Sequence, residues 1–196
     1  MLSEKLKSSG IADKSDLDSV WPSDERLQKG PVVIVECFQE IPCNPCETSC
    51  PRKAIVVGGD INVLPQVDHG KCNGCSICVS RCPGLAVFVV DATYSERESA
   101  ITLPFEFLPL PHKGETVEAL DREGKLRGLA KVVKVVNTKA QDRTPLVTLA
   151  VPRGLEREVR FFRKTGNAGF DGFGNPSATL RQAQGPAHRK QAQPKG

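Results

Sequence analysis

The stretch that decides the fold is Cys72-Asn73-Gly74-Cys75-Ser76-Ile77-Cys78-Val79-Ser80-Arg81-Cys82-Pro83. Its cysteines follow the spacing C-x2-C-x2-C-x3-C-P, which is typical of thiolate ligands to 4Fe-4S clusters. Three thiolates that are two residues apart can surround one cluster, while the turns between them point backbone N–H groups at its sulfurs. We expect the fourth cysteine to lie at the start of a helix, because the proline after it suits an N-terminal helical position. It is therefore predicted to reach a different cluster.

The same unit occurs twice. A shift of 32 residues lays Cys43, Cys46, Cys50, Pro51, Ala54 and Val57 on Cys75, Cys78, Cys82, Pro83, Ala86 and Val89. The first copy departs from the pattern, because five residues separate Cys37 from Cys43 instead of two. Loop closure costs grow slowly with length, so we predict that Cys37 is still a ligand. The alternative is a buried thiol at a strand end, which leaves a three-iron cluster or an iron with a non-protein ligand.

Two pseudo-symmetric halves predict two 4Fe-4S clusters, and each fourth cysteine is expected to complete the cluster of the other half. Cluster one is assigned to Cys37, Cys43, Cys46 and Cys82. Cluster two is assigned to Cys72, Cys75, Cys78 and Cys50. Zinc is the main competing metal, but structural zinc sites use paired knuckles separated by a longer linker. Disulfides are disfavoured, because all eight cysteines lie between residues 37 and 82 of a chain without an export signal.

From about Val32 to Val90 the sequence resembles the bacterial two-cluster 4Fe-4S ferredoxin domain, closely over residues 72–90 and with the widened first gap over residues 37–57. This resemblance implies a compact βαββαβ unit with two clusters close together. A wider stretch is similar to the small iron-sulfur subunits of FAD-dependent amino-acid or opine-type dehydrogenases. It runs from Glu36-Cys37-Phe38-Gln39-Glu40-Ile41-Pro42-Cys43-Asn44-Pro45-Cys46-Glu47 through Asp142-Arg143-Thr144-Pro145-Leu146-Val147-Thr148-Leu149. That similarity implies a flavoprotein partner, a hetero-oligomer and a cytoplasmic complex.

The expected fold class is α+β, in four parts. Residues 1–30 are predicted to form an N-terminal arm of short helical turns, and residues 31–93 the ferredoxin-like two-cluster domain. Residues 104–163 contain runs rich in Val and Leu separated by turns, which favour a small antiparallel β unit or half-barrel. Residues 164–196 are rich in Gly and Pro and poor in apolar groups, so we expect a disordered basic tail.

The charge distribution gives no reason to expect a nucleic-acid binder. The formal net charge is +4, but residues 1–163 carry 22 bases and 22 acids, so the excess lies in the tail. The longest apolar run, Leu85 to Val90, is too short to span a membrane. The start, Met1-Leu2-Ser3-Glu4-Lys5, lacks an apolar signal segment, so we expect a cytoplasmic protein without membrane contact.

No catalytic constellation is visible in the sequence. Neither G-x-G-x-x-G after a strand nor a P-loop occurs, and no carboxylate pair can be placed from the pattern. The expected function is therefore that of an electron-transfer subunit, which relays single electrons to or from a flavoprotein dehydrogenase. The alternatives are a freely diffusing soluble ferredoxin and a zinc-stabilised interaction module. Residues 104–163 exceed what a diffusing ferredoxin needs, which favours a fixed partner.

Overall fold

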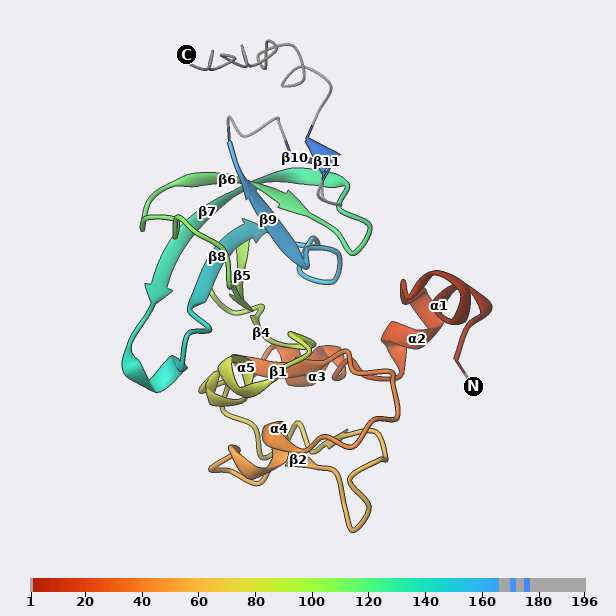
Figure 1. Ribbon diagram of the computed structural model, residues 1–196. Helices are drawn as coiled ribbons and strands as arrows, with labels where there is room; N and C mark the ends of the chain where they lie inside the picture. Colours follow the sequence, from red (N-terminus) through yellow and green to blue (C-terminus); the bar gives the residue numbers. More distant parts are fainter. Residues whose placement is uncertain (1, 166–169, 172–174, 177–196) are drawn as a thin grey trace, which may run out of the picture. The chain divides into compact units, whose positions relative to one another are not determined.

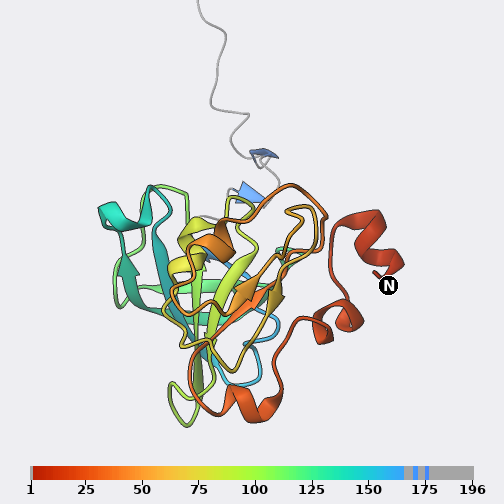
Figure 2. The ribbon, with the colours of Figure 1, turned by 90° about the horizontal axis from the view of Figure 1, so that it is seen from below.

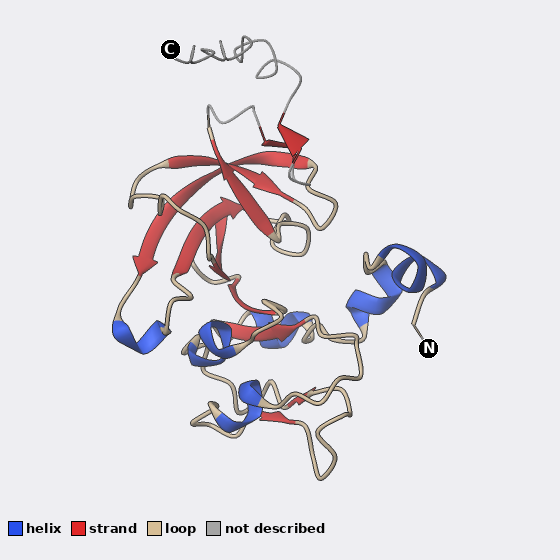
Figure 3. Cartoon of the chain, viewed as in Figure 1, coloured by secondary structure: helices blue, strands red, loops and turns tan. Residues whose placement is uncertain are grey.

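The computed structural model describes residues 2–165, 170–171 and 175–176. The chain divides into two compact units, Met1–Lys164 and Thr165–Gly196. In the first unit the strands contain more residues than the helices, and the helices are short (Figure 1, Figure 3). No helix within the described residues is both long and apolar enough to cross a lipid bilayer.

The N-terminal arm consists of three short helices. They are α1 (Glu4–Ser9), α2 (Lys14–Asp18) and α3 (Asp24–Leu27). Each begins after a residue whose side chain accepts a hydrogen bond from the first helical turn, namely Ser3, Asp13 and Ser23. Asp16 ties α2 to α1, because its carboxylate accepts from the backbone N–H and the hydroxyl of Ser3 at 2.9 and 2.6 Å. The arm reaches the core through the buried side chains of Trp21 and Leu27.

Between residues 32 and 91 the elements follow in the order strand, helix, strand, strand, helix, strand. They are β1 (Val32–Val35), α4 (Pro45–Thr48), β2 (Ile55–Val56), β3 (Gln66–Val67), α5 (Ile77–Arg81) and β4 (Val87–Asp91). β1 pairs antiparallel with β4, and β2 pairs antiparallel with β3. α4 and α5 lie side by side in two views (Figure 1, Figure 2). The two copies of the repeat are therefore in direct contact.

The helix that we expected to begin at Cys82 does not exist. α5 ends at Arg81, and Cys82 follows it in an extended conformation. Pro83 explains the stop, because the residue before a proline is disfavoured in the helical region. The first copy behaves alike, since α4 ends at Thr48, before Cys50. Each fourth cysteine thus follows its helix, and the prediction was wrong on this point.

One seven-stranded antiparallel sheet joins the cysteine region to the rest of the first unit. Its further strands are β5 (Glu98–Pro104), β6 (Thr116–Leu120), β7 (Leu126–Val136), β8 (Leu146–Pro152) and β9 (Phe161–Lys164), and the 3-10 helix η1 (Lys139–Gln141) lies between β7 and β8. The strand order is β1-β4-β5-β8-β7-β6-β9. β5 makes the connection, because it pairs with β4 on one side and with β8 on the other. The domain boundary between residues 93 and 104 stays a prediction.

β1 and β4 separate two hydrophobic cores. Alternate residues of a strand face opposite sides, so Val32 and Ile34 belong to the larger core, and Val33 and Val35 to the smaller one. The larger core lies among β4 to β9, and the smaller core contains the side chain of Cys78. Both faces of β1 are buried, which explains why this strand reads as an unbroken apolar run.

The second unit contains two short described strands, β10 (Phe170–Asp171) and β11 (Asn175–Pro176), which pair antiparallel. The disordered tail predicted for residues 164–196 lies outside the described residues, apart from these strands, Lys164 at the end of β9, and Thr165.

Candidate metal centres

Four cysteines line one pocket, which we call the first thiol pocket. They are Cys37, Cys43, Cys46 and Cys82. Cys37 comes two residues after β1, Cys46 lies on α4, and Cys82 directly follows α5. The empty space is about 380 Å³, part of it open to solvent, and its lining includes Val35 and Val87, which pair across β1 and β4.

The other four cysteines line the second thiol pocket, with an empty space of about 280 Å³. They are Cys50, Cys72, Cys75 and Cys78. Its lining includes Val33 and Val89, the next inward pair of β1 and β4. The two pockets therefore lie against one face of the same strand pair, at positions about 7 Å apart along the strands. Each pocket takes three cysteines from one copy of the repeat and the fourth from the other copy.

The fourth cysteine of each copy begins a local motif that we call the cysteine hook, residues 50–54 and 82–86. In each hook the N–H of the alanine donates to the Sγ of the cysteine four residues earlier, at 3.3 Å in residues 50–54 and 3.4 Å in residues 82–86. The residue before the alanine is left-handed, with a φ of 49° at Lys53 and 52° at Leu85. Non-glycine residues rarely adopt this conformation, and it persists where the surrounding structure imposes it.

Cys72 is held by two backbone N–H groups and by one arginine side chain. The N–H groups of Val33 and Gly74 each donate to its Sγ at 3.4 Å, and Arg26 donates to its carbonyl oxygen at 2.7 Å. Gly74 is required here, because a Cβ at this position would lie 2.5 Å from the Cβ of Pro31. The sequence did not reveal Arg26, since this carbonyl partner lies 46 residues away along the chain.

The buried thiols resist ionisation unless positive charge enters the pockets. Burial raises the pKa of Cys78 to about 12 and that of Cys46 to about 11, and neighbouring cysteines add to both shifts. Burial also raises the pKa of Cys37. Iron supplies positive charge, and thiolates are the ligands that iron-sulfur clusters take, so the donor set fits such a group.

The four thiols of each pocket line a hollow and do not converge on the position of a single metal ion. Within the described part of the chain, no three or more His, Cys, Asp or Glu side chains are gathered closely enough to hold a single metal ion. All eight predicted ligands line one of the two pockets, and Cys37, the most doubtful on spacing, lines the first. Its role as a ligand stays a prediction.

The comparisons with known proteins point to the second copy of the repeat. Residues 65–88 match the family model described as a 4Fe-4S binding domain. The match includes Cys72, Cys75, Cys78 and Cys82. The chain therefore contains a ferredoxin-type iron-sulfur domain, with a 4Fe-4S cluster and an electron-transfer role. No curated protein and no solved structure matches the chain.

Proposed function

We propose that the chain holds two 4Fe-4S clusters, one in each thiol pocket, and passes single electrons to or from a partner flavoprotein dehydrogenase. The observation that carries the proposal is the sorting of eight cysteines into two groups of four, with the fourth cysteine exchanged between the copies. Cluster one takes the first thiol pocket and cluster two the second. The unit formed by β1, α4, β2, β3, α5 and β4 is then a two-cluster ferredoxin-like βαββαβ domain.

A 4Fe-4S cluster with four thiolate ligands supplies one-electron transfer without an open coordination position. The chain's own residues set the conditions for that transfer. N–H groups of Val33, Ala54 and Ala86 direct partial positive charge at ligand sulfurs, which favours the more negative, reduced state. Val35 and Val89, buried under the two pockets, keep water from their inner sides. A short path joins the pockets, because their lining positions on the strand pair are about 7 Å apart.

Exposed apolar side chains outside the cysteine region support the proposal of a stable complex with a partner protein. Among residues 2–165, four large apolar side chains are more than half exposed, namely Phe107, Leu108, Leu126 and Leu129. Leu108 is 87% exposed, and its neighbour Phe107 rests against Phe105 and Phe161, with ring centroids 5.7 Å apart in both pairs. Phe107 and Leu108 are adjacent, and contiguous exposed apolar groups are typical of protein interfaces. They favour a flavoprotein subunit over a freely diffusing ferredoxin.

Iron analysis of cysteine variants tests the two clusters. The anaerobically purified protein is expected to contain about eight iron atoms per chain, and Cys75→Ser and Cys82→Ser are each expected to lose about half of them. The reduced variants should lack different cluster signals in electron paramagnetic resonance. Asn73→Ser, at a non-thiol position of the second thiol pocket, is the control and should keep all its iron. A preparation with zinc in place of iron would contradict the proposal.

Purification from the native source tests the partner. The complex should migrate on size exclusion well above the 21.2 kDa of this chain and carry a flavin absorption, with the partner identified by mass spectrometry. Migration of the iron-loaded chain alone would instead favour a diffusing ferredoxin, and it would leave the result on the clusters unchanged.

A further inference from the structure

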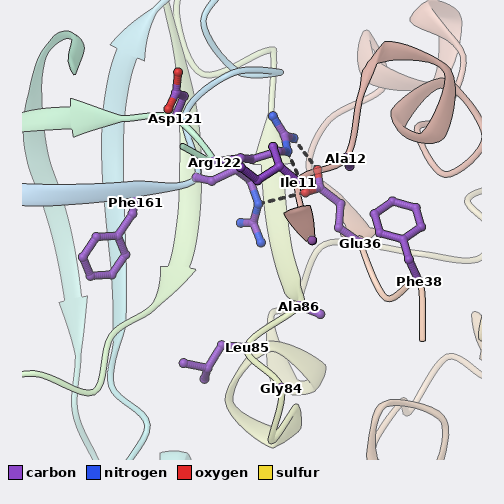
Figure 4. Close-up of a pocket in the computed structure, with 12 residues that line it drawn as sticks. Ile11, Ala12, Glu36, Phe38, Gly84, Leu85, Ala86, Asp121, Arg122 and Phe161 are labelled. Carbon is purple, nitrogen blue, oxygen red and sulfur yellow. Dashed lines mark hydrogen bonds and ion pairs between the residues drawn. The ribbon is translucent and has the colours of Figure 1, made fainter. Parts of the chain in front are cut away.

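A third hollow lies beside the first thiol pocket, because its lining flanks Cys37 and Cys82, and we call it the arginine pocket (Figure 4). Its cavity volume is about 350 Å³, which lies at the lower end of the size range of small-molecule sites. The lining comes from the arm (residues 10–12), from the cysteine region (Glu36, Phe38 and residues 84–86) and from the sheet region (residues 121–122 and 160–161). Three segments far apart in the sequence thus meet around one space.

The side chains of this pocket include more positive charge than their acidic partner neutralises, because Arg122 and Arg160 both pair with Glu36. The Glu36 side chain, 6% exposed, lies between two guanidinium groups (Figure 4). Arg122 donates to it through Nε at 2.9 Å and also through Nη2, and Arg160 donates through Nε at 3.1 Å. The other acid of the lining, Asp121, is already bound by Arg127 and by two backbone N–H groups. Two largely covered cations, whose side chains are 14% and 13% exposed, therefore share one carboxylate.

Arg160 has donors to spare. Arg122 uses its third nitrogen as well, because Nη1 donates to the carbonyl oxygen of Arg157 at 2.7 Å. In contrast, no acceptor in the described part of the chain receives a hydrogen bond from Nη1 or Nη2 of Arg160. Its guanidinium lies over the Phe88 ring at 3.7 Å, which fixes its plane. Burial lowers the pKa of Arg160, and the attraction of Glu36 opposes this only in part.

The walls beside these donors are apolar. Ile11, Phe38, Leu85 and Phe161 line the pocket, with Phe38 and Phe161 on opposite sides of Glu36 (Figure 4). A guanidinium edge whose N–H groups have no acceptor in the described part of the chain matches the two oxygens of a carboxylate. We propose that the arginine pocket binds a small organic carboxylate, whose charged group pairs with Arg160 and whose apolar body lies between Phe38 and Phe161.

The position of the pocket couples this ligand to cluster one, a step that rests on the proposed function. Phe38 directly follows Cys37, and residues 84–86 follow Cys82. A bound carboxylate neutralises the positive charge beside these two ligands, so it disfavours an added electron there. The oxidised protein should therefore bind the carboxylate more tightly than the reduced protein. By linkage, a tenfold difference lowers the midpoint potential of cluster one by about 59 mV.

Anaerobic calorimetry of the oxidised, iron-loaded full chain tests the site with benzoate as the probe. Benzoate is expected to bind at least about tenfold more tightly than neutral benzamide, because a buried charge-assisted pair is lost with the amide. Inorganic phosphate tests whether charge alone suffices, and it should bind more weakly than benzoate. Arg160→Gln should weaken benzoate binding by about tenfold or more. Arg163→Gln is the matched control, because Arg163 pairs with Glu118 and does not line the pocket.

A second variant separates the site from the fold. Ala12→Phe fills the pocket from the arm and leaves both arginines unchanged, and it should also lose benzoate while keeping its iron and its near-ultraviolet circular dichroism. The proposal is overturned if benzoate and benzamide bind equally or not at all, if phosphate binds as tightly as benzoate, or if either pocket variant binds benzoate like the wild type. An unchanged cluster-one potential with benzoate bound would overturn the coupling. Calorimetry needs no redox step, so failure of the electron-transfer proposal would show separately, in the iron content and the resonance spectra.

Discussion

The two copies of the cysteine repeat have the same structure at the fourth cysteine, which belongs to the other copy's thiol pocket. They differ in the loop between the first two cysteines, which both belong to one pocket. Both copies carry the same cysteine hook, with an N–H bond to the fourth thiol and a left-handed residue before the alanine. We call the loop between the first two cysteines of each copy its starting loop. In the first copy this loop has five residues between Cys37 and Cys43, with Ile41 exposed, and in the second copy it has two, between Cys72 and Cys75. A loop that returns to its own pocket tolerates extra length at small cost. The hook has no such freedom, since it sets where the next strand begins.

Gly74→Ala is the strongest way to test the tightness of the second starting loop, where the first copy has Pro42. The new Cβ would lie 2.5 Å from the Cβ of Pro31, on a backbone with a φ of 68°. Overpacking and strain together are expected to lower the free energy of unfolding by about 2–4 kcal/mol and to reduce iron in the second thiol pocket. Denaturant titration and iron analysis measure both effects. Gly84→Ala is the control, because no atom lies within 4 Å of its added Cβ, and equal losses in both variants would break the comparison.

The helices of the two copies differ in burial, and matched substitutions test this. Val79 on α5 is 0% exposed in the smaller core, whereas Glu47, the equivalent residue on α4, is half-buried outside it. Val79→Ala should cost about 2 kcal/mol of unfolding free energy through lost burial and a residual cavity. Glu47→Ala should change it by less than about 0.5 kcal/mol. Similar costs at both positions would mean that α4 and α5 support the fold equally.

The smallest expected effect concerns the left-handed residue of each hook. Lys53→Gly relieves a backbone penalty of about 1–2 kcal/mol and adds an entropic cost of about 0.5–1 kcal/mol, so a net gain of about 0.5 kcal/mol is expected. Leu85→Gly should instead destabilise the protein, because Leu85 is half-buried and loses its apolar contacts. Thermal unfolding of the two variants gives the signs. A loss of stability in Lys53→Gly would show that the left-handed residue is not strained.

Local patterns predicted much of the molecule, and their failures have physical reasons. The cysteine spacing predicted an iron-sulfur domain, which the family match at residues 65–88 confirms. Runs rich in Val and Leu predicted a β unit within residues 104–163, and the described strands β6, β7, β8 and β9 lie there. β5 was missed, because Ser99 and Ala100 give a weak strand signal and burial within the sheet holds it in place. The prediction of a helix that begins at Cys82 was wrong. Pro83 favours a helix start, but it also disfavours the helical conformation of the residue before it, and this second effect was the larger one.

The sequence by itself determined the ligand chemistry, because the spacing of cysteines over a dozen residues depends on local backbone geometry alone. Only the tertiary structure decided the position of the arginine pocket beside the first thiol pocket. Glu36 meets Arg122 and Arg160 across 86 and 124 residues. Glu36 follows β1 at one edge of the sheet, and the two arginines flank β6 and β9 at the other edge, so they meet only because the sheet folds back on itself. Contacts at such separations depend on the complete path of the chain, so no local pattern of residues contains them.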